Sequence, residues 1–172
     1  QVMQVHDLLA AQSTYNYEAL EQVGTKAESL SHQAYSCLVA GDPYEPVCDG
    51  YAKAVKVVCD LLEIPCVLVS SDTHMWNNVK MDDGDWYNLD LTWDDTGDTG
   101  SHLYFLVGSM TVVDGQMFCQ QPDHLEKNPW VPDADLDTVN FRYPTKNTDA
   151  YVYQPGGYEP LRFPDVKRSA WY

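Results

Sequence analysis

Residues 47–66 read VCDGYAKAVKVVCDLLEIPC, the most regularly patterned segment of the chain. Its apolar residues recur at helical spacing from Cys48 onward, which predicts a long amphipathic helix beginning at that cysteine. The apolar stripe consists of Tyr51, Val55, Val58, Cys59 and Leu62. The helix is expected to end before Pro65, because the residue that precedes a proline avoids helical backbone angles.

A β-hairpin is predicted next along the chain. The segments HMWNNVKM at 74–81 and DWYNLDLTW at 85–93 are strand-like and are separated by the turn sequence DDG. A three-residue loop of this kind places its glycine in the left-handed conformation and sets Met81 opposite Asp85.

The predicted register decides which side chains share a face of the hairpin. It sets Trp76 opposite Asp90, and His74 lies on the same face because side chains alternate along a strand. His74 and Asp90 are then diagonal neighbours within reach of each other. A two-residue loop would instead place them on opposite faces. The other face is expected to form the core, through Met75, Val79, Met81, Tyr87, Leu89 and Leu91.

The order of the remaining elements indicates the fold class. The expected elements are helices within 1–22 and over 28–39, a proline- and glycine-rich break over 41–46, and strands at 66–71 and 102–108. The rest of the chain is expected to wrap the core as loop with short strands. Helices followed by an antiparallel sheet indicate an α+β fold, and the length suits one domain, residues 1–172.

Composition and charge exclude several classes of partner. The chain has 44% apolar and 21% charged residues, as soluble globular proteins do, and its net charge is −16. So acidic a surface repels phosphate backbones and anionic lipid heads, so we expect no nucleic-acid partner. No apolar run approaches the roughly 20 residues of a membrane helix, so no membrane insertion is expected. We interpret the acidity as an aid to solubility, with a preference for basic protein substrates as the alternative.

No metal site and no cofactor are predicted. The cysteines show no CxxC spacing, and the histidines form no HExxH or His-x-His cluster. Cys59 and Cys66 are expected in the core, whereas a Cys37–Cys119 disulfide is left open. Two acidic clusters have partial cation-loop spacing: Asp133, Asp135 and Asp137, and Asp94, Asp95 and Asp98. The first lacks the glycine of a calcium loop, and the second is interpreted as a solvated loop.

Cys48 has the setting of a nucleophile. It follows a proline-broken loop and begins the predicted helix, where free N–H groups and the helix dipole stabilise a thiolate. Gly50 is expected to leave space for a substrate backbone. A carboxylate beside a histidine fixes the tautomer that nucleophilic catalysis requires. Cys48, His74 and Asp90 are therefore the predicted catalytic triad, and the alternative for Cys48 is a buried structural cysteine.

Three segments together resemble the transglutaminase-like superfamily. VCDGYAKAVKVVCDLLEIPC, HMWNNVKM and DWYNLDLTWDD follow the family patterns Cys-x-Gly-Tyr-Ala, His-x-Trp-Asn-x-Val and Trp-Tyr-x-x-Asp-x-Thr-Trp in the same order. The resemblance covers about residues 30–108 and implies a papain-like catalytic core there, with 109–172 as a wrapping segment. The upstream HDLLAAQSTYNYEAL is similar to the lead-in of secreted Firmicute-type members, which implies a bacterial protein at an extracellular or cell-surface location. Because the chain opens with Gln1 rather than Met, we expect a processed product or an excised piece.

The resemblance also implies an activity, through a thioester on Cys48 that is either hydrolysed or transferred to an amine. True transglutaminases use an upstream tryptophan as an oxyanion donor, and no tryptophan precedes Trp76 here. We therefore expect a cysteine peptidase or amidase acting on peptide or isopeptide amides. One oxyanion donor is the Cys48 N–H; Tyr35 is preferred as the second over Tyr44 and Gln33. Tyr44 and Trp76 are candidate substrate-groove residues.

Other functions stay open at this point. A transglutaminase would crosslink protein glutamines to amines, and a non-catalytic module would bind protein or cell-wall polymer in the same groove. The intact triad argues against the binding module. Small-molecule acyl transfer, as in arylamine acetyltransferases, is a weaker third option, and glycopeptide amidases usually carry paired CxxC zinc motifs that this chain lacks. The expected partner is a protein or peptide substrate, with cell-wall polymer as the alternative.

Overall fold

The structure is a computed structural model that describes residues 1–39, 45–97, 101–127 and 143–153. The predictions for Tyr44, Asp98, Asp133, Asp135 and Asp137 fall outside the described residues.

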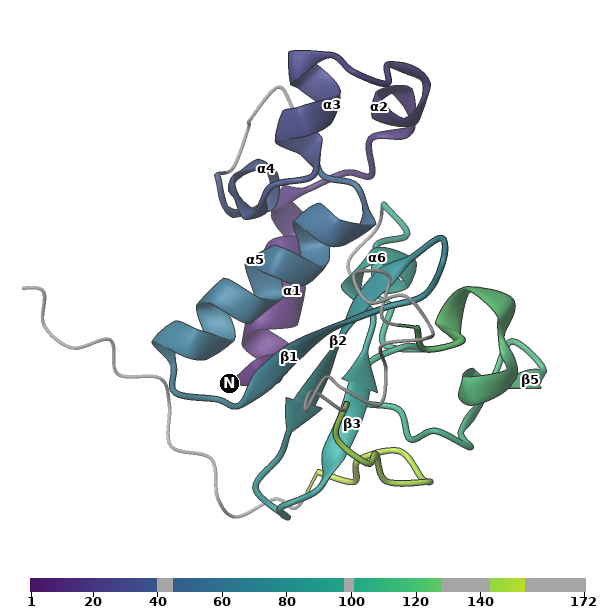
Figure 1. Cartoon of the computed structure of the whole chain (residues 1–172). Helices are drawn as coiled ribbons and strands as arrows, with labels where there is room; N and C mark the ends of the chain where they lie inside the picture. Colours follow the sequence, from purple (N-terminus) through teal and green to yellow (C-terminus); the bar gives the residue numbers. More distant parts are fainter. Residues whose placement is uncertain (40–44, 98–100, 128–142, 154–172) are drawn as a thin grey trace, which may run out of the picture.

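Helices form the first part of the chain. The elements are α1 (Val2–Gln12), α2 (Tyr17–Glu21), α3 (Lys26–Ser31), α4 (Ala34–Leu38) and the long α5 (Cys48–Leu61). The prediction of one or two short helices within 1–22 is confirmed by α1 and α2. Figure 1 shows α1 and α5 side by side along the sheet, with α2, α3 and α4 gathered at the start of α5.

The single helix predicted over 28–39 is wrong, because the chain forms two helices, α3 and α4, that are interrupted after Ser31. The Ser31 carbonyl accepts hydrogen bonds from the Val47 N–H at 3.1 Å and from the Ser36 hydroxyl at 3.2 Å. The Ser31 carbonyl therefore accepts hydrogen bonds from groups that are not four residues further along a helix. The interruption ties the start of α4 to the residue immediately before Cys48.

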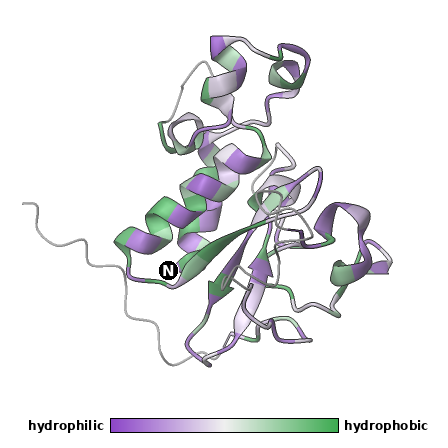
Figure 2. Ribbon diagram, viewed as in Figure 1, coloured by the Kyte–Doolittle hydropathy of each residue, from purple (hydrophilic) through white to green (hydrophobic). Residues whose placement is uncertain are grey.

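The sheet follows the helices. Its strands are β1 (Cys66–Ser70), β2 (Met75–Lys80) and β3 (Trp86–Leu89), paired antiparallel in the order β1-β2-β3. Figure 2 shows hydrophobic and hydrophilic residues alternating around α5. The apolar stripe predicted for this helix packs in the core between α1, α5 and one face of the sheet. Helices and an antiparallel sheet confirm the mixed α+β class.

The hairpin between β2 and β3 has the predicted register. Asn77 lies opposite Leu89, and the Met81 N–H donates to the Asp85 carbonyl at 2.9 Å. Gly84 has a φ of 90°, the backbone conformation that the three-residue loop requires. A local turn signal thus fixes the pairing that brings the two strand ends together.

The second face of the sheet is also covered. The covering segment contains β4 (Val112–Val113), β5 (Gln116–Met117), η1 (Phe118–Gln120) and η2 (Pro122–His124), whereas α6 (Leu91–Asp94) follows β3 and packs its Leu91 into the first core. A second hydrophobic cluster on the second face consists of Val69, Trp76, Tyr104, Val107, Val113 and Phe118. The strand predicted at 102–108 is wrong: within the described residues this segment makes one isolated bridge, from Val107 to Asn88, and Leu106 breaks the extended backbone with a φ of 52°.

Candidate active site

Cys48 is the first residue of α5, and its side chain is partly exposed. The helix has 14 residues, so its dipole favours negative charge at this end. Gly50 packs against the chain itself, because a Cβ there would lie 2.5 Å from the Ser31 carbonyl oxygen. The room expected at Gly50 for a substrate backbone is therefore taken by Ser31, and the glycine serves to position the first turn of α5.

His74 lies in the turn between β1 and β2, directly before Met75. The turn is closed by Ser71, whose N–H donates to the His74 carbonyl at 2.9 Å and whose hydroxyl accepts from the His74 N–H at 3.0 Å. The imidazole is largely buried, and its Nε2 lies 2.6 Å from Asp90 Oδ2. Burial alone lowers the pKa of His74, but the Asp90 charge and hydrogen bonds with Asp90 and Cys48 raise that pKa to about 10.

Asp90 is fully buried and bonds through both oxygens. Asp90 is the N-cap of α6, and its Oδ1 accepts hydrogen bonds from the N–H groups of Thr92 at 3.0 Å and Trp93 at 3.3 Å. Its Oδ2 faces the Nε2 atoms of His74 and His124. Burial raises the pKa of Asp90, but the charge of His74 and hydrogen bonds from both histidines lower it to about 2. Asp90 is thus a buried carboxylate that holds its charge.

His124 is a member of this group that the sequence interpretation missed. It lies in η2, is 1% exposed, and places its Nε2 2.8 Å from Asp90 Oδ2. Its Nδ1 lies 2.7 Å from Gln121 Oε1, and the Gln121 amide donates to the Val113 carbonyl at 2.9 Å. No periodicity links a histidine in this turn to Asp90, so the sequence carried no signal for the contact.

Trp76 does not have the groove role predicted for it, and the oxyanion-donor role predicted for Tyr35 stays a prediction. Trp76 is 1% exposed and stacks beneath His74 at 6.1 Å, so it supports the imidazole and does not line a groove. Tyr35 is half-exposed on α4, and no hydrogen bond within the described residues joins its hydroxyl to the triad. The side chain of Gln33 donates to the Ser29 carbonyl at 3.3 Å. In the described part of the chain, neither Tyr35 nor Gln33 makes a hydrogen bond with Cys48.

Tyr15, rather than Tyr35 or Gln33, lies beside the backbone of Cys48. It lies in the link between α1 and α2, where the Asn16 N–H donates to the Pro46 carbonyl at 2.9 Å. Burial and the negative charge of Cys48 raise the pKa of Tyr15 to about 12, while a hydrogen bond with the Cys48 backbone acts in the opposite direction. The hydroxyl therefore lies beside the Cys48 N–H. The Tyr15 ring is parallel to that of Tyr51, with centroids 6.4 Å apart.

A cleft opens beside His74, with a volume of about 430 Å³. Its lining residues are Tyr15, Tyr17, Leu20, Thr73, His74, Thr92, Trp93, Asp95 and Asp123. Trp93 is therefore a groove residue. The two carboxylates give the cleft an acidic character, and the aromatic rings give it walls on which an apolar chain can lie.

Of the predicted acidic cluster, Asp94 ends α6 and Asp95 follows the helix. Asp94 is fully buried: its Oδ2 lies 3.2 Å from His6 Nε2, and its Oδ1 accepts the Tyr104 N–H at 3.0 Å. Asp95 accepts a short hydrogen bond from the Tyr51 hydroxyl. The two carboxylates thus serve different neighbours. The interpretation as a solvated loop is wrong for Asp94, which is buried in α6, whereas Asp95 is partly exposed beyond the helix.

The remaining cysteines are all free thiols. Cys59 and Cys66 are buried, as predicted, and Cys37 is also buried. Cys119 is exposed and unpaired, so the Cys37–Cys119 disulfide left open by the sequence is not formed here.

No protein-family model matches this sequence, and no curated protein matches it significantly. Within the described residues, no helix combines the length and apolar character needed to cross a bilayer.

Proposed function

We propose that the protein is a thiol-dependent acyl hydrolase, a cysteine peptidase or amidase with a papain-like, transglutaminase-like core. One observation carries the proposal: the His74 imidazole is hydrogen-bonded to Asp90 through Nε2 and also to Cys48. Because Nε2 serves Asp90, Nδ1 is the nitrogen available to the thiol. Hydrogen bonds then join a nucleophile to a base and that base to an orienting carboxylate.

Acylation follows from this chain of contacts. The Cys48 thiolate attacks the carbonyl carbon of an amide, and its Sγ–C bond forms as the carbonyl π pair moves onto oxygen. The protonated His74 then gives its Nδ1 proton to the leaving nitrogen, the C–N bond breaks, and a free amine or ammonia departs. Water attacks the thioester with His74 as base, which releases a carboxylic acid and restores Cys48.

Two groups are proposed to stabilise the oxyanion. The Cys48 N–H points from the start of α5, and the Tyr15 hydroxyl lies beside it. In the substrate-free protein the Cys48 N–H bonds to the Tyr15 oxygen. A developing oxyanion would take that N–H and receive the phenolic hydrogen as its second bond.

The cleft supports a peptide or protein substrate. Asp95 and Asp123 favour a cationic group near the scissile amide, and Tyr17 and Trp93 offer apolar walls. The same carboxylates favour one second function, in which an amine enters the cleft as its cation, loses a proton to His74 and attacks the thioester, as in a crosslinking transglutaminase. We place hydrolysis first because no tryptophan precedes the nucleophile. The secreted-type lead-in supports action outside the cell, on protein or on cell-wall polymer.

A substrate screen with intact-mass detection tests the proposal. Peptide amides and isopeptides with and without a neighbouring lysine are incubated with the protein, and amine or ammonia release is measured. Release should be lost in Cys48→Ala and retained in Cys119→Ala, which removes the exposed cysteine. A substrate adduct should map to Cys48. Equal release by Cys48→Ala would reject the thioester mechanism.

Tyr15→Phe tests the second oxyanion donor. Loss of one such donor lowers kcat by about 10²–10³ with little change in KM. Unchanged kcat would remove Tyr15 from the site and leave the Cys48 N–H with another partner.

A further inference from the structure

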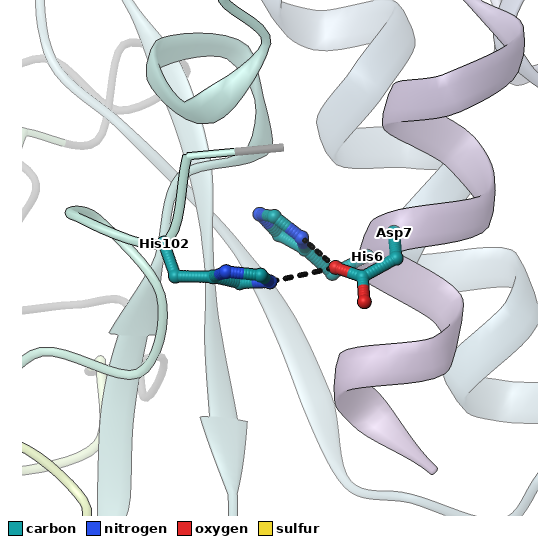
Figure 3. A group of neighbouring side chains, drawn as sticks. All are labelled: His6, Asp7 and His102. Atoms are coloured by element: carbon teal, nitrogen blue, oxygen red, sulfur yellow. Dashed lines mark hydrogen bonds and ion pairs between the residues drawn. The ribbon is translucent and has the colours of Figure 1, made fainter. Parts of the chain in front are cut away.

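Three side chains of metal-ligand type converge between α1 and the segment that follows α6 (Figure 3). His6 and Asp7 project from α1, and His102 comes from the segment after α6 (Figure 3). Asp7 Oδ1 lies 3.0 Å from His6 Nδ1 and 2.7 Å from His102 Nε2. One potential ligand atom from each residue lies within 4.8 Å of the others.

A fourth residue fixes the orientation of His6. Its Nε2 lies 3.2 Å from Oδ2 of Asp94, and both side chains are fully buried. Asp94 is held in turn by the Tyr104 N–H at its other oxygen. A buried carboxylate on one ring nitrogen is how proteins orient a metal-binding histidine, because it leaves the lone pair of the other nitrogen free for the ion. Here that other nitrogen, Nδ1, faces Asp7.

The arrangement calls for a cation between these atoms. A neutral imidazole has one N–H and one lone pair. If Nε2 of His6 donates to Asp94, the Nδ1 lone pair points at a lone pair of Asp7, which is repulsive. A proton relieves this contact with one carboxylate, whereas a divalent ion would satisfy His6, Asp7 and His102 together.

We propose that His6, Asp7 and His102 bind one divalent transition-metal ion of the Zn²⁺ class. Two imidazoles and a carboxylate form a set that Zn²⁺ accepts in tetrahedral sites, with water as the fourth ligand. Ligands about 2.1 Å from such an ion are roughly 3.4 Å apart, so the contacts of 3.0 and 2.7 Å would widen by less than about 1 Å. The Asp7 and His102 side chains are 48% and 42% exposed, so they can adjust and admit the ion.

Charge also favours the ion. Two carboxylates, Asp7 and Asp94, balance the two positive charges, and the surrounding protein is strongly acidic. The ion would clamp α1 to the segment that follows α6, two parts of the chain that are far apart in sequence. Because the folded protein presents the ligands together, binding raises the stability of the fold by mass action.

The active-site group is the competing metal site. His74, Asp90 and His124 also offer three ligand atoms, and the Cys48 sulfur is a fourth donor beside His74. The test therefore uses the full chain in a Cys48→Ala background, with a further His74→Ala version. Metal is first removed with a chelator, and Zn²⁺ binding is then measured by calorimetry, with Co²⁺ absorption bands as a report on coordination.

One Zn²⁺ should bind per chain in the Cys48→Ala protein and equally in Cys48→Ala/His74→Ala. His102→Ala and Asp7→Asn should each weaken binding about tenfold or more, abolish the visible Co²⁺ bands, and cancel the Zn²⁺-dependent rise in unfolding temperature. Both positions are exposed, so both variants should fold. His32→Ala is the matched control, since His32 bridges Glu28 and Asp49 through opposite ring nitrogens that do not converge.

Three results would overturn the proposal. They are the absence of a bound ion in the chelator-treated parent, binding that persists unchanged in both His102→Ala and Asp7→Asn, and binding lost in the His74→Ala version. None of these depends on a substrate. The outcome is therefore separate from the fate of the proposed hydrolase.

Discussion

Replacing Asp90 with asparagine keeps its shape and removes its charge. The carboxylate bonds the N–H groups of Thr92 and Trp93 at one oxygen and the Nε2 atoms of His74 and His124 at the other. A carboxamide has one oxygen, and its nitrogen only donates. If the asparagine oxygen keeps the two α6 N–H groups, its NH₂ faces both imidazoles. Their Nε2 atoms must then accept.

This change inverts the tautomer of His74. The ring proton moves to Nδ1, the nitrogen that faces Cys48, and the ring no longer accepts the thiol proton. Two charge-assisted hydrogen bonds are lost, at about 1.5–3 kcal/mol each, or roughly 3–6 kcal/mol together. At about 1.4 kcal/mol per tenfold change, turnover should fall by about 10²–10⁴.

Two measurements check this prediction. The first is kcat/KM on the amide substrate found by the screen, and the second is the rate of Cys48 alkylation by iodoacetamide between pH 5 and 9, which needs no substrate. Asp72→Asn is the control, because it removes the same charge two residues from His74, at an exposed position paired with Lys127. If Asp90→Asn behaves like Asp72→Asn and the parent in both assays, Asp90 is structural and the triad is refuted.

Four further outcomes are expected. Iodoacetamide should label Cys48 before Cys119, although Cys119 is the more exposed thiol, and site-resolved mass spectrometry would detect the reverse order. With dansyl-cadaverine present, ammonia or amine release should exceed dye incorporation; incorporation in excess that disappears in Cys48→Ala would identify a transferase. Gly50→Ala should destabilise the fold by about 1–3 kcal/mol in denaturant unfolding, since its Cβ meets a carbonyl oxygen at 2.5 Å. Because the pKa of His74 is raised in the folded protein, its contribution to the free energy of unfolding is full below pH 6.5 and is lost as the pH rises through about 10. Because the pKa of Asp90 is lowered, its contribution is full above pH 3.8 and is lost as the pH falls toward about 2. Unfolding temperatures should therefore be highest between pH 3.8 and 6.5, and Asp90→Asn should flatten the profile.

The features predicted correctly from the sequence are those that depend on neighbouring residues. The turn around Gly84 fixes the pairing of β2 with β3, and strand alternation then places His74 near Asp90. The apolar spacing of α5 likewise sets Cys48 at the start of a helix. Each inference needs only about 20 consecutive residues, because local backbone geometry and side-chain period carry the information.

The features that were missed depend on distant parts of the chain. Trp76 was expected in a groove because alternation cannot tell whether a second layer covers that face, and Phe118 packs against it. His124 reaches Asp90 across 34 positions through an irregular turn. Tyr15 sits in a link between two helices, where spacing gives no direction to its side chain. Contacts of this kind are set by tertiary packing, which local patterns do not encode.

The walls of the cleft come from both sides of the motif-bearing stretch, and this affects how the protein can be shortened. A version trimmed to residues 30–108 would keep Cys48, His74 and Asp90. It would lack Tyr15 beside Cys48 and His124 beside Asp90. It would also expose the apolar surface of α5 that α1 covers. Recombinant boundaries, library designs and transplants of this triad into another scaffold should therefore include both flanks.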